Sequence, residues 1–220
     1  DDTTNNTCAL LADENCGVLA LGFDSGCTAE DSVGFELGPG AASNGQLGQI
    51  SDTAGADFMT AFECRVKISS IATGYNCFAV GLAGPAISAN GGLIDTNGGP
   101  MANKAFIGFN ILADDGDSMD FCYQGASQTR NDLIAGVHVP VADTFVKLGF
   151  IYDPGAVASK RITVYVNNVE QTTHVTATQI AAATFPDAEA LTFAMHAKSV
   201  TGGAVLEAAI DWWSFAQVIS

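Results

Sequence analysis

The residues best suited to bond cleavage in this sequence are two carboxylates near its C-terminus, Glu207 and Asp211. Glycoside hydrolysis uses two carboxyl groups that flank the scissile bond, about 5–5.5 Å apart in retaining enzymes and about 6.5–9.5 Å apart in inverting ones. Four residues of extended strand span roughly 13 Å, so the two side chains share one face but lie too far apart. Ala208, Ala209 and Ile210 between them add no third acid. The spacing therefore weighs against a glycosidase.

Three histidines, His138, His174 and His196, are the available general bases for a serine or cysteine nucleophile. None of them accompanies a Gly-x-Ser-x-Gly elbow. The glycine pairs also lack the following Lys-Ser/Thr and helix that a phosphate-binding loop requires. The sequence therefore predicts no catalytic residue and no cofactor site, and we expect that the chain is not an enzyme.

Four aspartates gather in one short segment: Asp114, Asp115, Asp117 and Asp120. Carboxylate oxygens are hard ligands of the kind that calcium prefers, but their order does not match the twelve-residue EF-hand loop. Two interpretations stay open, a weak calcium site and a solvated acidic turn, and the turn is favoured. Titration with calcium would separate them.

Two adjacent tryptophans, Trp212 and Trp213, lie in the last predicted strand. Neighbouring side chains of a strand point to opposite faces, so one ring should enter the core and the other should face outward. An outward tryptophan is a common platform for a sugar or anchor for a protein partner, although a loop can also simply cover it. We therefore treat both as candidate contact or glycan residues.

The six cysteines include no Cys-x-x-Cys pair and no cluster with the spacing of a zinc site. We expect mostly free thiols, with a Cys8–Cys16 or a Cys16–Cys27 pairing as the exception. Cys64 falls on the apolar side of an alternating segment, where a buried thiol behaves as a small hydrophobic residue.

Alternation of apolar and polar residues dominates the informative segments, which predicts half-buried strands over 58–68, 144–153 and 161–167. Asn167-Asn168 suits a two-residue hairpin turn, since asparagine tolerates positive φ. Seven further strands are predicted at 18–23, 33–37, 76–83, 105–112, 119–124, 191–198 and 205–215. One short helical turn is expected over 178–183, capped by Thr178.

About ten strands with so little helix predict an all-β fold, an antiparallel two-sheet sandwich of the jelly-roll or concanavalin (lectin-like) kind. Residues 31–220 would form this single sandwich domain, and residues 1–30 an N-terminal arm or extension. The Gly- and Asn-rich stretch 85–104 has no strand pattern and is expected to be a surface loop, either a contact site or plain solvent loop.

The charge balance excludes some partners. The sequence holds 8 Lys and Arg against 24 Asp and Glu, a net charge of −16 over 220 residues. Such a chain repels nucleic-acid phosphates and anionic lipid head groups. No apolar run reaches the roughly 20 residues that a membrane-spanning helix needs. We therefore expect neither a nucleic-acid partner nor a membrane partner.

The last third of the chain carries a recognisable combination of strands and turns: VKLGFIYDP at 146–154, ITVYVN at 162–167, FP at 185–186 before LTFA at 191–194, and IDWWSFAQ at 210–217. It resembles the concanavalin-like jelly-roll structural proteins of tailed bacteriophages, particularly capsid decoration (cement) proteins. The resemblance covers about residues 140–220. Its motifs indicate a fold rather than a catalytic site.

This resemblance implies a virion structural protein on the outer capsid surface, assembled in the host cytoplasm. As a homotrimer it would bridge and stabilise neighbouring major capsid subunits, and burying surface on several subunits at once would make its detachment slow. The alternative is a carbohydrate-binding module or glycan-degrading virion component, suggested by the lectin-like sandwich and by Trp212 and Trp213. A trimer would favour the capsid role, whereas a monomer with an open aromatic groove would favour the sugar role.

Overall fold

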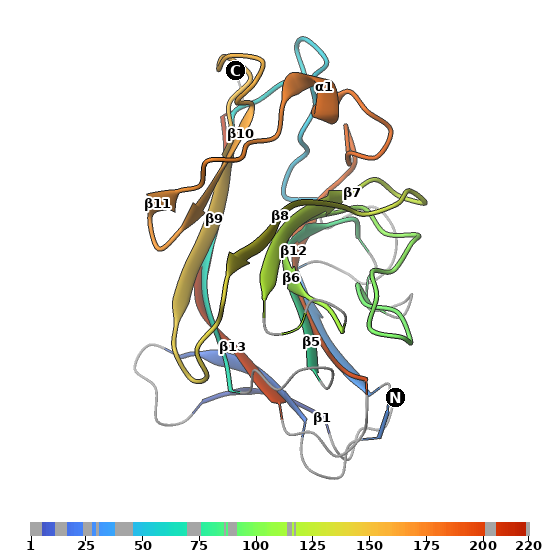
Figure 1. Cartoon of the computed structure of the whole chain (residues 1–220), viewed down its shortest axis with the longest axis vertical. Helices are drawn as coiled ribbons and strands as arrows, with labels where there is room; N and C mark the ends of the chain where they lie inside the picture. Colours follow the sequence, from blue (N-terminus) through green and yellow to red (C-terminus); the bar gives the residue numbers. More distant parts are fainter. Residues whose placement is uncertain are drawn as a thin grey trace.

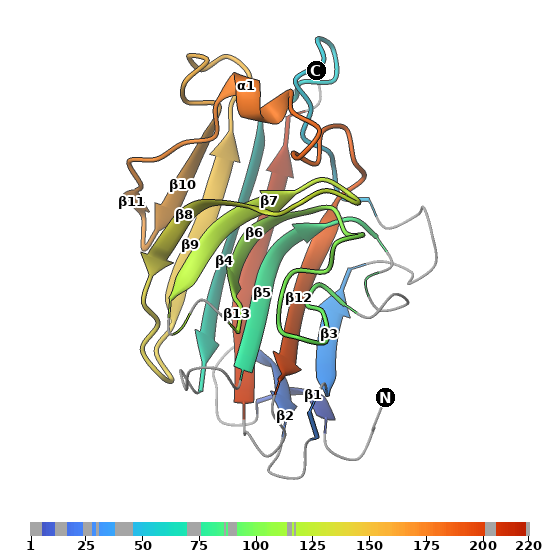
Figure 2. The same cartoon turned by 45° about the vertical axis from the view of Figure 1, so that its right-hand side comes forward.

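Two antiparallel β-sheets packed face to face make up most of this protein (Figure 1). A computed structural model describes residues 6–11, 17–23, 28–29, 31–37, 46–69, 76–85, 87, 92–113, 116, 118–200 and 206–218. Seen after a turn of 45°, one sheet lies in front of the other (Figure 2). The predicted all-β two-sheet sandwich is therefore confirmed.

One sheet has seven strands in the order β1-β2-β13-β4-β9-β10-β11. Its strands are β1 (Asn6–Leu10), β2 (Leu19–Phe23), β4 (Thr60–Ile68), β9 (Val146–Tyr152), β10 (Ile162–Val166), β11 (Val169–Glu170) and β13 (Leu206–Gln217). β1 and β2 come from the segment 1–30, which the sequence analysis placed in an extension. They pair with each other, and β2 pairs with β13, so both strands belong to the sheet.

The other sheet has six strands in the order β3-β12-β5-β6-β7-β8. They are β3 (Ser32–Glu36), β5 (Asn76–Ala83), β6 (Phe106–Ile111), β7 (Met119–Gln124), β8 (Asn131–His138) and β12 (Thr192–Ser199). β8 has no counterpart among the predicted strands. It is an edge strand with two register irregularities against β7, and Gly136 within it has a φ of 63°, so its sequence shows no regular alternation.

The core lies between the sheets and is built from the apolar side of each alternating strand. Phe62 and Phe150 meet with ring centres 5.5 Å apart, and Phe109 and Phe121 with ring centres 5.2 Å apart. Cys64 is fully buried among them, as the alternation predicts. Each fully buried phenylalanine contributes about 1.5–3 kcal/mol to folding, so this layer supplies much of the driving force.

The outer face of the six-stranded sheet is covered by the segment that precedes β6, drawn in green on the far side of β5 and β6 from the other sheet (Figure 1). Ile87, Leu93 and Ile94 are buried against this face. The Ile87 backbone N–H donates a hydrogen bond of 2.7 Å to the Glu36 carboxylate on β3. The part of 85–104 that the structure describes is a loop, as predicted, but it is not a plain solvent loop, because apolar residues fasten it to the sheet.

Two local predictions can be compared with the structure at the level of single turns. Asn167 and Asn168 have φ values of 50° and 66°, which confirms the two-residue hairpin turn between β10 and β11. The short helix α1 (Ala177–Ile180) also exists, but its cap is Thr176 rather than Thr178. Thr176 and Gln179 form a capping box, and this reciprocal pair sets where the helix starts.

Cys8 and Cys64 carry free thiols. The expected Cys8–Cys16 and Cys16–Cys27 pairings involve Cys16 and Cys27, which lie outside the described residues. Burial raises the pKa of the Cys64 thiol, which keeps it protonated and unreactive inside the core.

Across the part of the chain that the structure describes, α1 is the one α-helix, and nothing helical is long and apolar enough to cross a membrane.

Candidate functional site

A groove of about 410 Å³ runs over the outer face of the seven-stranded sheet, across β13, β4, β9 and β10. It is built from the residues that alternate with the core residues of these strands, so the pattern that buries one side of each strand also places the groove. Its lining consists of Ala61, Phe62, Glu63, Lys147, Leu148, Gly149, Phe150, Ile151, Tyr165, Asn168, Ser214 and Ala216.

The groove is hollow because small residues line its middle. Gly149 on β9 pairs with Glu63 on β4 on one side and with Tyr165 on β10 on the other. A Cβ atom at this position would lie 2.8 Å from the carbonyl oxygen of Phe62 and 3.0 Å from Cβ of Glu63. Glycine therefore keeps the centre of the sheet surface open between the longer flanking side chains.

The charges in the groove form a matched pair. Lys147 Nζ lies 2.6 Å from Glu63 Oε2, with the two side chains 31% and 43% exposed. The same ammonium lies 5.4 Å from the ring centre of Trp212, close enough for a cation–π contact. A pair this exposed adds little to stability, about 0–1 kcal/mol. The effect of this ion pair is local, because it holds the Lys147 side chain between Glu63 and Trp212.

A β-bulge in β13 decides which tryptophan faces outward. Ile210 pairs with Val66 but Trp212 pairs with Arg65, so Asp211 is an extra residue. Trp213 then packs into the core, with its ring stacked on Phe193 at a centre-to-centre distance of 4.8 Å.

Trp212 lies on the outer face beside the groove, since Lys147 contacts its ring. The prediction that one ring enters the core and the other faces outward is confirmed.

The two carboxylates considered as a glycosidase pair, Asp211 and Glu207, lie outside the groove. The Asp211 carboxylate forms an ion pair with Arg65, whose guanidinium lies 4.2 Å from the ring centre of Phe145. The Glu207 backbone N–H donates to the Ser69 hydroxyl at 2.8 Å. Neither residue lines the groove. The glycosidase pair considered from the sequence is therefore not assembled there.

The calcium candidates are only partly described. Asp114, Asp115 and Asp117 lie outside the described residues. Asp120 is buried on β7, where its carboxylate accepts a hydrogen bond of 2.6 Å from the Gly136 backbone N–H. In the described ranges, no group of three or more His, Cys, Asp or Glu side chains could hold a metal ion. Asp120 therefore has a structural role at the bulged edge between β7 and β8.

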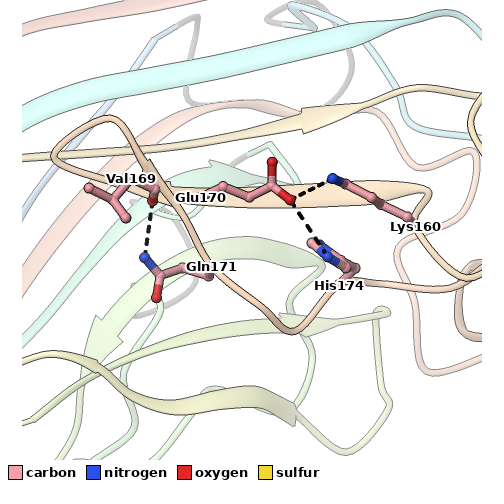
Figure 3. Close-up of polar contacts among 5 residues, drawn as sticks. All are labelled: Lys160, Val169, Glu170, Gln171 and His174. Carbon is pink, nitrogen blue, oxygen red and sulfur yellow. Dashed lines mark hydrogen bonds and ion pairs between the residues drawn. The ribbon is translucent and has the colours of Figure 1, made fainter.

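The three histidines lie in three different parts of the molecule. His138 ends β8, and partial burial lowers its pKa. His174 lies before α1, with Nε2 at 3.8 Å from Glu170 Oε1, which also binds Lys160 Nζ at 2.5 Å (Figure 3). Gln171 closes this turn by donating to the Val169 carbonyl at 3.0 Å.

This cluster holds the β10–β11 hairpin to the preceding loop. Hydrogen bonding and ion pairing with Lys160 lower the pKa of Glu170.

His196 belongs to a second polar region, on the covered face of the six-stranded sheet. It lies in one row with Ala79 on β5 and Asn110 on β6. Gly92, with a φ of 87°, approaches the imidazole so closely that a side chain there would overlap the ring. Burial, helped by Lys198, lowers the pKa of His196 to about 4, so the ring is neutral near pH 7. Part of the protein's own chain covers this face, so the face is not open to a polymer.

A smaller pocket of about 170 Å³ lies beside α1, lined by Asp52, Asp57, Tyr152, Arg161 and neighbouring residues. Tyr152 donates its hydroxyl to the Ser51 carbonyl at 2.6 Å, and burial raises its pKa to about 12. The hydroxyl is therefore a fixed donor that ties the 46–59 segment to the sandwich.

Sequence reasoning missed the groove, although the signal for it was present. The predicted strand 144–153 placed Lys147 and Gly149 on its outward side, and the strand 58–68 placed Glu63 there. The sequence did not show that β4 and β9 are neighbours in a register that sets Glu63 opposite Gly149. Of the candidate site residues named from the sequence, Trp212 is the one that adjoins the groove, and Asn168 of the predicted turn lies in its lining.

No protein-family model and no curated protein sequence matches the chain. Solved structures do resemble it. A Trichoderma reesei endo-β-1,4-glucuronan lyase has a TM-score of 0.57 at 10% identity, over 98% of this chain and 89% of the lyase. The Bacteroides ovatus mixed-linkage glucan protein of glycoside hydrolase family 16, in complex with its product, has a TM-score of 0.55 at 12% identity, over 98% and 86%.

A Corynebacterium alginate lyase has a TM-score of 0.53 at 10% identity, over 96% of this chain and 81% of the lyase. At these identities the likeness shows the fold, a concanavalin-like jelly-roll sandwich. The prediction that the chain is not an enzyme is overturned by this finding, because polysaccharide lyases and glycoside hydrolases are built on the same sandwich. The absence of a contiguous motif does not exclude a catalytic site, since side chains from separate strands can form one on such a fold.

Proposed function

We propose that this protein binds a polysaccharide in the groove on its seven-stranded sheet. The observation that carries the proposal is an open groove of about 410 Å³ with Tyr165 in its lining and Trp212 beside it, on a sandwich shared with carbohydrate-active proteins. Aromatic rings offer a flat apolar surface for the C–H face of a sugar.

The polar side chains of the groove suit the rest of the sugar. Glu63 accepts hydrogen bonds, Lys147 donates them, and Tyr165, Asn168 and Ser214 do both. Sugar hydroxyls are donors and acceptors as well, so they can use this mixed set. The groove is also continuous over four strands, which suits a chain of sugars more than a single small molecule.

The experiment is a binding measurement against polysaccharides of different backbones, by glycan array followed by isothermal titration. Trp212→Ala should weaken binding by about tenfold or more, since a tenfold change corresponds to about 1.4 kcal/mol and an aromatic contact of this size supplies that much. Trp212→Phe should retain part of the affinity.

Val157→Ala serves as the control, because Val157 is exposed and lies outside the groove lining. Equal thermal midpoints of the variants would show that the fold is intact. The absence of binding to every polysaccharide, or equal affinity of the wild type and Trp212→Ala, would overturn the proposal.

The same incubations should be analysed for cleavage, by new reducing ends for hydrolysis and by unsaturated products for elimination. The relevant comparison is Glu63→Gln against the wild type, because Glu63 is the carboxylate in the groove lining. Product formed by the wild type and lost in this variant would extend the proposal from binding to degradation.

A second candidate function is a virion structural protein that bridges major capsid subunits on the outer head surface. It is supported by the resemblance in segments 146–154, 162–167 and 210–217, which lie in β9, β10 and β13. The protein would then be a homotrimer in the assembled particle, and a capsid neighbour would occupy the outer face of these strands. Co-sedimentation with heads that lack the protein, together with its mass in solution by light scattering, tests this role. A monomer that does not pellet with heads would refute it.

A further inference from the structure

We infer that the groove prefers neutral polysaccharides over polyuronates, an inference that rests on the proposed glycan-binding function. Its basis is the pairing of charges on and beside the outer face of the seven-stranded sheet. Polyuronates carry a carboxylate on every sugar, so a site for them needs unpaired cations along its length. The charged residues in the groove lining are Glu63 and Lys147, one of each sign.

The cation in the groove is already engaged. Lys147 Nζ lies 2.6 Å from Glu63 Oε2 and also over the Trp212 ring. A uronate that bound Lys147 would place its own carboxylate beside that of Glu63. Like charges at such a distance repel, so this contact gains little or nothing.

Two cations beyond the sides of the groove, Arg65 and Lys160, are paired in the same way. Arg65, which pairs across the sheet with Trp212, binds the Asp211 carboxylate. Lys160 binds Glu170, whose strand position is opposite Tyr165 (Figure 3). A polyuronate that lies along this row therefore meets ion pairs rather than open positive charge.

The whole molecule adds to this selectivity. A net charge of −16 gives the protein a negative field that repels a polyanion before contact. A neutral chain feels no such repulsion. Its hydroxyls can bind to Glu63 and Lys147 without breaking their ion pair, because a carboxylate and an ammonium in a pair keep further hydrogen-bonding capacity.

The test uses two ligands with the same backbone: mixed-linkage β-glucan oligosaccharides, and the same oligosaccharides with their primary hydroxyls oxidised to carboxylates. Alginate oligosaccharides provide a second polyuronate. In isothermal titration at low salt, the neutral glucan should bind at least about tenfold more tightly than either polyuronate. The difference should shrink as salt is raised, since screening shortens the range of the repulsion.

Glu63→Gln makes the test sharper, because it removes the partner of Lys147 and leaves an unpaired ammonium in the groove. It should raise the affinity for both polyuronates several-fold and should not raise the affinity for the neutral glucan. Glu189→Gln is the matched control, since it changes the net charge by the same amount outside the groove.

The outcomes separate the two proposals. Equal or tighter binding of the polyuronates by the wild type, with the loss of that binding in Trp212→Ala, would overturn the charge selection and keep the glycan-binding function. Binding of none of these ligands, nor of any other polysaccharide, would overturn the function itself and the inference with it. A neutral preference that Glu63→Gln and Glu189→Gln change equally would show that net charge, rather than the groove, is responsible, and would also overturn the inference.

Discussion

Gly149 and the pair of Glu63 and Lys147 give the groove its shape and its charge. Gly149 leaves room at the centre of the sheet surface, and the ion pair fixes two long side chains at its edge. Glu63 lies on β4, whereas Lys147 and Gly149 lie on β9, 84 and 86 residues further along the chain. The register of the two strands sets Glu63 opposite Gly149. The chemistry of the groove thus depends on a pairing between distant strands.

Filling the centre of the groove should harm both stability and binding. In Gly149→Ala the new Cβ atom would meet the Phe62 carbonyl oxygen at 2.8 Å, which forces β4 and β9 apart. We expect a loss of about 1–3 kcal/mol in the free energy of unfolding, together with weaker glycan binding. Denaturant titration measures the first effect and calorimetry the second.

Gly84→Ala is the control for this change, since its Cβ atom would make an ordinary contact of 3.4 Å with Ala105. It should leave stability unchanged or raise it by up to about 1 kcal/mol, because alanine restricts the unfolded chain. Equal effects of the two substitutions would contradict the packing assigned to Gly149.

His196 should make stability depend on pH. Its pKa in the folded protein is about 4, against an ordinary value of 6.5, so the unfolded chain takes up the proton first as the pH falls. The contribution of the neutral ring to the free energy of unfolding, roughly 3 kcal/mol, is fully present above pH 6.5. It is lost as the pH falls from 6.5 to about 4.

Urea denaturation of the wild type and of His196→Asn at pH 7, 5.5 and 4.5 measures this contribution. The carboxylates titrate in both proteins, so the difference between the two profiles isolates the histidine. As the pH is lowered, the free energy of unfolding of the variant should decrease less steeply than that of the wild type. Parallel profiles would contradict the burial of a neutral imidazole beneath Gly92.

Two elements show how a local irregularity places functional side chains. The bulge at Asp211 lets both Ile210 and Trp213 of β13 face the core, so that Trp212 remains outside. The hairpin at Asn167 and Asn168 brings Asn168 to the end of the groove. Both devices are short, and both lie in or beside strands that were predicted from the sequence.

The start of α1 supplies a test at the scale of one element. Thr176→Ala removes the hydroxyl that accepts a hydrogen bond from the Gln179 backbone N–H, so it should cost about 0.5–2 kcal/mol of stability. Thr178→Ala, at the exposed residue first expected to be the cap, should change stability by less than about 0.5 kcal/mol. Thermal or urea unfolding compares the two, and a larger effect at Thr178 would refute the assigned cap.

The predicted strands include those with one buried face and also β6, β7 and β12, which are buried along their whole length. β4 and β9 alternate cleanly, with Glu63 and Lys147 outward, and both were found. β8 was not predicted because it is a bulged edge strand. The burial of Leu93 and Ile94 was not predicted because a loop that packs on a sheet has no periodicity. Periodicity reports a regular element with one apolar side, and neither of these segments is such an element.

At the scale of the whole molecule, the two outer faces of the sandwich differ. The six-stranded sheet is covered by the chain itself, whereas the seven-stranded sheet keeps an open groove. The net charge of −16 surrounds both sheets and opposes compaction.

Salt should therefore stabilise this protein at neutral pH. Raising the ionic strength from about 0.01 M to about 0.15 M shortens the screening length from about 30 Å to about 8 Å, which weakens the self-repulsion. We expect the thermal midpoint to rise by a few degrees in sodium chloride, since about 1 kcal/mol shifts it by 2–4 °C in a domain of this size.

Differential scanning fluorimetry at pH 7 and near the isoelectric point of about 4.1 measures this effect. Near the isoelectric point the effect should vanish, because the net charge is close to zero there. A midpoint that falls with salt at pH 7 would show that surface ion pairs outweigh the self-repulsion.

The sequence by itself determined the fold class, the alternation that buries one side of β4 and β9, the turn at Asn167-Asn168 and the opposite directions of Trp212 and Trp213. These properties depend on residues that are close in the chain. Tertiary structure decided the groove, the pairing of Lys147 with Glu63 and the covering of the six-stranded sheet, since each requires a particular register between strands that are distant in the chain. Backbone periodicity is a local property, but strand order and register are set by the packing of the whole sandwich, and so the site emerged only there.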